Sequence, residues 1–187
     1  MSSRRALLRG GAGLLGGTGL LGGCGFRPLY APDGTRTPGG DASPAIAAEL
    51  AAVRVAQIGE RAGQVLRRTL QRRLEGSLAG TASRYELQAS LVYNVELLGY
   101  RQDGLITRIR YLATGTWVLT TDAVQPVEVG RGTVRTLDAI NIPDLQFFAA
   151  DASREALERR MVDEVTDRIV LGVATALRRR LAAAPAA

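Results

Sequence analysis

Cys24 is the residue of this sequence whose chemistry is easiest to define, because it is the only cysteine and small residues stand directly before it. Leu21, Gly22 and Gly23 form the narrow subsite that a lipoprotein signal peptidase needs ahead of a cysteine. The thiol of that cysteine then receives lipid. A single cysteine also excludes a disulfide within the chain. We therefore predict that Cys24 is a lipid-attachment site.

Catalytic and metal-binding chemistry has little support elsewhere in the sequence. The sequence contains no histidine, so it offers no Ser/His/Asp or Cys/His catalytic unit and no cysteine–histidine ligand cluster for a soft metal. Asp163, Glu164 and Asp167 lie close together, but arginines follow or precede them within about a helical turn, which is typical of a solvated helix face. We expect no enzyme activity, no metal and no cofactor; an enzyme that uses carboxylates alone is the alternative.

Residues 1–23 have the layout of a lipoprotein signal peptide. Arginines begin the segment, a short run of Leu, Gly and Ala follows, and small residues end it. The run is too short and too rich in glycine for a comfortable membrane span. The pair Arg4 and Arg5 also fits a twin-arginine export signal, and an ordinary secretory signal is the equal alternative. Either route leads out of the cytoplasm.

The charge of the chain is mildly basic and rests on arginine alone. The full sequence has 24 basic and 18 acidic residues and a formal net charge of +6, with no lysine. Without the three arginines of residues 1–23, 21 basic and 18 acidic residues remain, a net charge of +3. Nucleic-acid binding would need a clustered basic face with interleaved aromatic residues. We therefore interpret the basicity as a solvated surface and expect no nucleic-acid partner.

The remaining sequence divides into a tether, a domain and a tail. Residues 24–48 are expected to be the lipidated N-terminus and a flexible tether, because residues 31–48 are rich in Pro, Gly, Asp, Ser, Thr and Ala. Residues 49–182 are expected to form one folded domain. Residues 183–187 are expected to be a frayed tail.

Hydrophobic periodicity predicts six elements in the domain. Helical elements show apolar residues three and four positions apart, and strands alternate apolar and polar residues. The expected order is strand 50–58, helix 60–78, strand 84–98, strand 105–121, strand 127–142 and helix 151–183. This order (β-α-β-β-β-α) predicts an α+β two-layer sandwich, in which two helices cover one face of a four-stranded, mostly antiparallel sheet.

Finer features are also expected at three positions. The Asp-Gly of residues 101–104 predicts a hairpin turn, because glycine readily adopts a positive φ. Gly130 and Gly132 predict a bulge in the last strand. Residues 143–150, with Phe147 and Phe148, are expected to form a loop that leads into the last helix.

Two stretches of this sequence carry a resemblance to a known family. Residues 24–30 read CGFRPLY, and residues 58–70 read IGERAGQVLRRTL. Both are similar to the LPS-assembly lipoprotein family LptE, especially its alphaproteobacterial branch. The first motif resembles the start of the mature family members and the second their first strand-to-helix segment. The order of elements and the length agree over nearly all of residues 24–182.

The resemblance implies a location, a partner and a ligand. The family consists of outer-membrane lipoproteins that face the periplasm and insert as a plug into the β-barrel LptD, and the complex places lipopolysaccharide in the outer leaflet. The resemblance further implies lipopolysaccharide binding and no enzyme activity. Gly25, in place of an aspartate after the cysteine, fits transport onward to the outer membrane. The alternative is a periplasm-facing lipoprotein that serves another envelope or barrel-assembly complex.

For contact with lipopolysaccharide, the sequence offers arginines near the expected hairpin tip. Arg101, Arg108 and Arg110 lie at or close to this tip, and a guanidinium binds phosphate through a fork of two N–H groups. The alternative is an exposed strand end whose charges are solvated. We take these three residues as the candidate ligand contact.

Overall fold

The computed structural model describes residues 44–142 and 147–183, all of which belong to the unit Arg36–Ala187. Cys24, the expected signal peptide and residues 31–43 of the expected tether lie outside the described residues, as does the end of the tail. For residues 147–150 the backbone alone is described.

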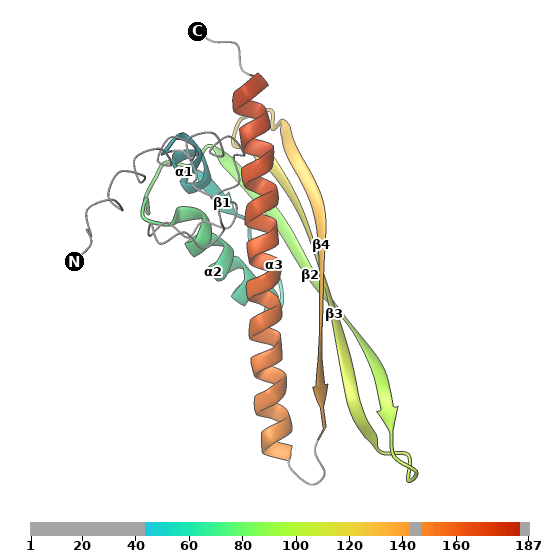
Figure 1. Cartoon of the computed structure of the whole chain (residues 1–187). Coiled ribbons are helices and arrows are strands. Elements are labelled where there is room, and N and C mark those ends of the chain that lie inside the picture. The colour runs from blue at the N-terminus through green and yellow to red at the C-terminus, as the bar shows by residue number, and fades with distance from the viewer. Residues whose placement is uncertain (1–43, 143–146, 184–187) are drawn as a thin grey trace, which may run out of the picture. The chain divides into compact units, whose positions relative to one another are not determined.

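Three helices and one four-stranded sheet make up this part of the chain (Figure 1). The helices are α1 (Pro44–Ala51), α2 (Arg61–Glu75) and α3 (Phe147–Ala183). The strands are β1 (Val53–Val55), β2 (Tyr85–Tyr100), β3 (Ile106–Thr121) and β4 (Glu128–Asn141). The sheet order is β1-β2-β3-β4; β1 and β2 are parallel, and the other neighbours are antiparallel. The α+β class and the mostly antiparallel sheet are confirmed, whereas the number of helices and their order differ from the expectation.

Helix α1 is the main correction to the expected elements. A coil up to residue 48 and a strand from Leu50 were expected, but residues 44–51 form a helix and β1 begins only at Val53. Pro44 suits the first helical position, where a backbone N–H has no helical partner to lose. Ile46 and Leu50 bury their side chains in the core. Short apolar runs such as this one do not separate helix from strand by period alone.

Two further expectations were wrong in detail. Phe147 and Phe148 lie in the first turn of α3 rather than in a loop. The bulge in β4 falls at Val129, because the register passes from Leu119 opposite Gly130 to Thr120 opposite Glu128. Gly130 therefore borders the bulge, and Gly132 does not take part in it.

The core lies between the sheet and the helices. Alternation along β2 and β3 places Leu87, Trp117 and Leu119 on the helix-facing side, where all three are buried. Helix α3 has 37 residues and a length of about 55 Å, close to the roughly 53 Å of a 16-residue strand. It runs along the sheet over β3 and β4 (Figure 1), so one helix covers that half of the sheet over its length.

Glycines make room for the indole of Trp117, the only tryptophan of the chain. A Cβ on Gly172 of α3 would lie 2.6 Å from Cζ2 of the ring, and a Cβ on Gly132 of β4 would lie 2.8 Å from Nε1. Two backbones therefore contact the ring directly. Helix and sheet can approach closely at this point only because neither position carries a side chain.

Helices α2 and α3 cover unequal lengths of the sheet. Helix α2 has 15 residues and a length of about 22 Å, and it packs on β1 and the first part of β2. Beyond it, helix-facing side chains of β2 are open to solvent: Val95 is 53% exposed and Leu97 is 45% exposed, whereas Leu87 is fully buried. The expectation of an apolar face covered by two helices thus holds for the near half of β2 and not for its far half.

Candidate functional site

The far end of the β2–β3 hairpin is closed by the turn that the sequence predicted. Gly104 has a φ of +83°, and its N–H donates to the Arg101 carbonyl at 3.0 Å. The Arg101 N–H in turn donates to the Leu105 carbonyl at 2.8 Å. The Leu105 N–H donates to the carboxylate of Asp103 at 3.2 Å. The tip is therefore an ordered turn, and it fixes the positions of the side chains beside it.

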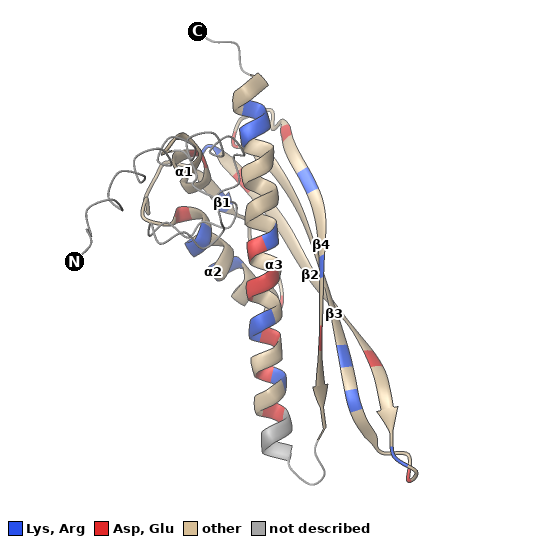
Figure 2. Cartoon of the chain, in the orientation of Figure 1, with Lys and Arg blue, Asp and Glu red and all other residues tan. Residues whose placement is uncertain are grey.

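The structure brings the three predicted arginines to this end of the hairpin, and two of them contact acids there. Arg101 lies 3.2 Å from the carboxylate of Asp103, and Arg110 lies 3.2 Å from the carboxylate of Glu96 across the strand pair. Arg108 is exposed and forms no ion pair with any other described residue. Figure 2 shows the resulting mixture of basic and acidic positions near the tip. Arg108 is thus the arginine of the three whose guanidinium is most open to a ligand.

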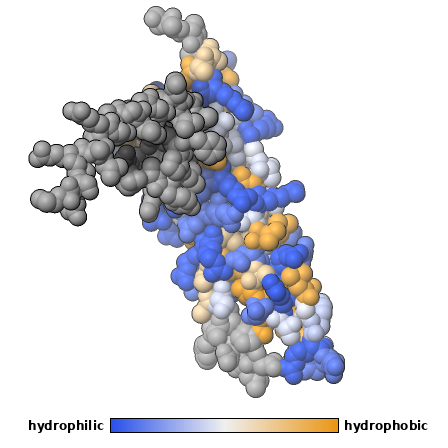
Figure 3. Space-filling model, viewed as in Figure 1, coloured by the Kyte–Doolittle hydropathy of each residue, from blue (hydrophilic) through white to orange (hydrophobic). Residues whose placement is uncertain are grey.

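Exposed apolar side chains also lie on the outer part of this hairpin, and the sequence interpretation missed their exposure. At least 40% of each is accessible to solvent. We call this set the distal apolar surface: Val95, Leu97, Leu98, Tyr100 and Leu105. Val92 is also exposed but lies on the opposite face of β2 from Val95 and Leu97. Figure 3 shows apolar side chains interleaved with hydrophilic ones over the lower half of the described surface. A clue existed in the sequence, since the expected first helix was too short to follow the whole of the expected 15-residue strand.

Tyr93 lies at the base of the distal apolar surface and carries a buried hydroxyl. That hydroxyl has no hydrogen-bond partner within the described part of the chain. Burial, and then the negative charge of Glu158 on α3, raise the pKa of Tyr93 to about 12. Glu158 itself accepts a hydrogen bond from Arg154 at 3.1 Å, which raises the pKa of Arg154. A phenol this weakly acidic is unsuited to proton transfer near neutral pH.

The described residues hold no group of three or more His, Cys, Asp or Glu side chains arranged to bind a metal ion. Among their helices, none is both long enough and apolar enough to cross a membrane. What the geometry offers is the end of a long hairpin that carries cationic groups on one face of its strands and exposed apolar groups on the other face and at the turn. Such a surface suits a ligand with both phosphate groups and hydrocarbon.

Comparison with known families decides which group of proteins this is. Residues 50–171 match the family model described as LptE, lipopolysaccharide-assembly. The chain belongs to the LptE family. The match covers well over half of the sequence and runs from α1 into α3. It confirms the family that the residue 24–30 and 58–70 motifs indicated. No curated protein matched the chain.

Solved structures of lipoproteins share the fold. A candidate lipoprotein from Caulobacter crescentus is 24% identical, with a TM-score of 0.56 over 76% of this chain and 99% of that one. The rare lipoprotein B from Shewanella oneidensis is 12% identical, with a TM-score of 0.52 over 70% and 98%. Lipoprotein B from Nitrosomonas europaea is 16% identical, with a TM-score of 0.51 over 70% and 86%. At these identities the likeness concerns the fold.

Proposed function

We propose that this LptE family member is an outer-membrane lipoprotein, anchored through Cys24, that plugs and supports an LptD-type β-barrel during lipopolysaccharide assembly. The observation that carries the proposal is the family match over residues 50–171, together with the lipidation motif at residues 21–24. Each methylene of an acyl chain that enters the bilayer contributes about 0.8 kcal/mol, so two or more long chains on Cys24 hold the protein at the membrane.

The exposed face of the sheet supports a position inside a large barrel, whose lumen is polar. On β3 the side chains that point away from the helices include Thr114, Thr116 and Thr120. They follow Arg110 toward the C-terminal end of the strand. Ser90 and Thr116 share a hydrogen bond across β2 and β3 at 2.6 Å. This face also carries the exposed Val92 and Leu137, so it offers a polar wall mainly hydroxyl and guanidinium groups with two apolar side chains among them.

Lipopolysaccharide contact is proposed at the hairpin tip. Arg108, with Arg101 and Arg110 beside it, would bind phosphate groups of the ligand, and the distal apolar surface would bind its acyl chains. Arg108 would contribute most, because the other two guanidiniums already contact Asp103 and Glu96.

The cellular role is tested by depletion and replacement. Depleting the protein should lower the amount of lipopolysaccharide at the cell surface, and the wild-type chain should restore it whereas Cys24→Ala should not. Mass spectrometry of the mature protein should find acyl chains on Cys24, and purification from membranes should yield an outer-membrane barrel. An unacylated mature chain, or co-purification with a different envelope complex, contradicts the proposal.

The ligand contact is tested by charge reversal with a matched control. Arg108→Glu should weaken lipopolysaccharide binding about tenfold or more, since it replaces a charge-assisted hydrogen bond with repulsion. Arg135→Glu on β4 makes the same charge change at another exposed position of the sheet and should leave binding within about twofold. Equal binding by the two variants would remove the hairpin tip as the contact.

A further inference from the structure

Helix α2 carries an excess of positive charge that the fold does not neutralise. It contains five arginines and one acid, Glu75. The carboxylate of Glu75 is already engaged by Arg54 at 3.0 Å and by the amide of Gln71 at 2.7 Å. Arg73 is paired with Asp167 of α3 at 3.6 Å, and Arg67 donates through Nε to the Val55 carbonyl at 3.2 Å.

The other three arginines form a single stripe on the solvent side of the helix. Arg61, Arg68 and Arg72 are separated by seven and four residues, so they share one face, opposite the buried Leu66 and Leu70. All three are exposed, and none forms an ion pair with another residue of the described part. We call these residues the α2 arginine stripe. It extends over about 16 Å along the helix.

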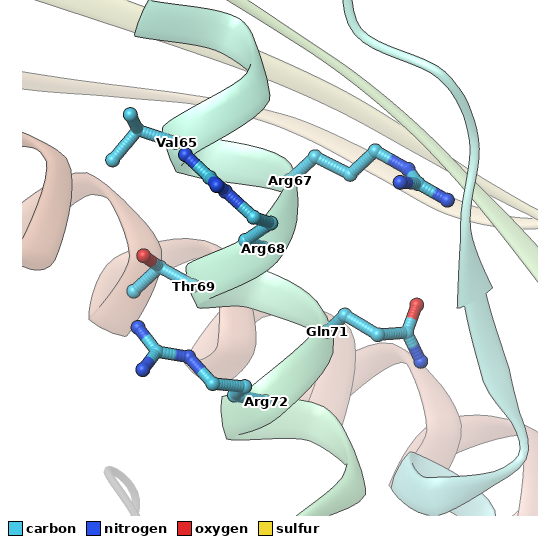
Figure 4. Close-up of a pocket in the computed structure, with 6 residues that line it drawn as sticks. All are labelled: Val65, Arg67, Arg68, Thr69, Gln71 and Arg72. Atoms are coloured by element: carbon cyan, nitrogen blue, oxygen red, sulfur yellow. The ribbon is translucent and has the colours of Figure 1, made fainter.

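Figure 4 shows which arginines of α2 point toward β1 and which point away from it. Arg67 and Gln71 project toward β1, whose backbone they contact, whereas Arg68 and Arg72 project to the other side together with Val65 and Thr69 (Figure 4). These six residues line a shallow, open hollow of about 490 Å³. The hollow is thus bordered by the guanidinium groups of Arg68 and Arg72, and neither forms an ion pair with an acidic residue of the described part.

The stripe stands in contrast to the arginines of α3. Four of those pair with a neighbouring acid, and Figure 2 shows red and blue alternating along that helix. The four pairs are Arg154 with Glu158, Arg159 with Glu155, Arg160 with Asp138, and Arg168 with Glu164. At least four of the seven arginines of α3 thus have an acid partner, whereas one of the five on α2 has such a partner among the described residues.

The stripe also carries a cost in helix stability. Arg68 and Arg72 are four residues apart, and like charges at that spacing repel each other. Arg61 is the first residue of the helix, where the dipole disfavours a positive charge, and the first turn holds no acid. An anion bound along this face would relieve both effects. Positions that break the local rules in this way are typical of binding sites.

The position of α2 in the domain indicates which anion is near. Helix α1 packs beside α2 and begins at Pro44, twenty positions after Cys24. A segment of that length reaches at most about 70 Å. If Cys24 is acylated, as the proposed function has it, α2 belongs to a domain that is held within this distance of a bilayer surface, where phosphate groups are dense.

We propose that the α2 arginine stripe binds the phosphate groups of anionic phospholipids and so seats this side of the domain on the membrane surface. The inference rests on the proposed function for the nearness of the membrane, but the charge and geometry of the stripe are independent of the anchor. Arginine suits this role because its fork of N–H groups matches phosphate oxygens, and a basic residue near an anionic surface gains attraction that salt screens.

The test uses the full chain with Cys24→Ser, so that no acyl chain contributes to binding. Co-sedimentation measures partition onto vesicles of phosphatidylcholine alone and of phosphatidylcholine mixed with phosphatidylglycerol. The stripe variant Arg61→Gln, Arg68→Gln, Arg72→Gln is compared with a control that loses the same charge at scattered exposed positions, Arg135→Gln, Arg159→Gln, Arg179→Gln. Glutamine keeps the helix propensity of arginine, and circular dichroism checks that both variants are folded.

We expect the stripe variant to lose about 100-fold in partition onto the phosphatidylglycerol vesicles at low salt, and the control variant to lose less than about fivefold. Equal losses in both variants would overturn the proposal, because net charge alone would then account for binding. Equal partition onto the neutral and anionic vesicles would also overturn it. A third vesicle containing lipopolysaccharide distinguishes the source of phosphate: stripe-dependent binding to that vesicle alone would refute the phospholipid assignment. Acylation of Cys24 is measured separately by mass spectrometry. It tests the lipid anchor of the proposed function independently of the vesicle result.

Discussion

Replacing Gly172 with alanine sets two effects of known size against each other. In a helix interior, alanine is more favourable than glycine by about 1 kcal/mol. At this position, however, the added Cβ would lie 2.6 Å from Cζ2 and 3.2 Å from Cε2 of Trp117. The indole cannot retreat, because the backbone of Gly132 contacts it from β4. Overpacking of this kind costs about 1–3 kcal/mol, so we expect a net destabilisation of about 1 kcal/mol.

The control is the same Gly172→Ala substitution made in a chain that also carries Trp117→Leu. With the indole gone, the clash disappears and only helix propensity remains, so Gly172→Ala should now stabilise the chain by about 1 kcal/mol. Urea denaturation followed by far-ultraviolet circular dichroism measures both backgrounds with one probe, and the melting temperature of the wild-type background should fall by about 3–5 °C. If alanine stabilises the protein while Trp117 is present, or has the same effect in both backgrounds, the indole is not confined between Gly172 and Gly132.

Three further predictions follow from burial and charge. Because the pKa of Tyr93 is about 12 in the folded chain and an ordinary phenol has a pKa of about 10, the folded state keeps its proton longer, and stability should fall as pH rises from about 10 to 12. Burial also raises the pKa of Tyr85, so Tyr93→Phe should reduce this fall in urea midpoints measured across that range, and the remainder should persist. Leu119→Ala should cost about 2–5 kcal/mol, since Leu119 is fully buried, whereas Leu97→Ala, at a side chain that is 45% exposed, should cost less than about 1 kcal/mol in the same assay, and equal costs would contradict the uncovered half of β2. Asp138→Asn removes a 2.6 Å ion pair between β4 and Arg160 of α3 that is open to solvent, so the loss should be below about 1 kcal/mol and should disappear at high salt; a loss that salt does not change would mean that the contact acts through packing.

The long elements could be predicted from the sequence because their patterns are long. The alternation through β2 and β3 and the i+4 stripe of α3 repeat many times, so tertiary contacts had little room to override them. Helix α1 could not be predicted in this way. Its eight residues are nearly all apolar but include only two large side chains, Ile46 and Leu50, whose burial depends on α2 and α3, which come later in the chain.

The sites differ in how far the sequence could indicate them. The spacing of Arg61, Arg68 and Arg72 places them on one helix face, but their lack of partners becomes apparent only when Glu75 is seen to contact Arg54. The exposure of the far half of β2 could have been estimated by comparing element lengths. The fit of Trp117 between two backbones could not, because it depends on contacts between β3, β4 and α3 that no local pattern specifies.

Helix α3 follows every other described element in the chain, yet it supplies the cover for β3 and β4. Until Val165 and Ile169 have emerged, the sheet around Gly115 lacks the helix side chains that pack on it. The domain therefore cannot mature stepwise from its N-terminus, and a chain that loses about its final fifth in translation or to a protease would expose the apolar side chains that α3 covers. The vulnerable interval therefore lies between the appearance of the β2–β3 hairpin and the completion of α3, which is when a chaperone would be of most use.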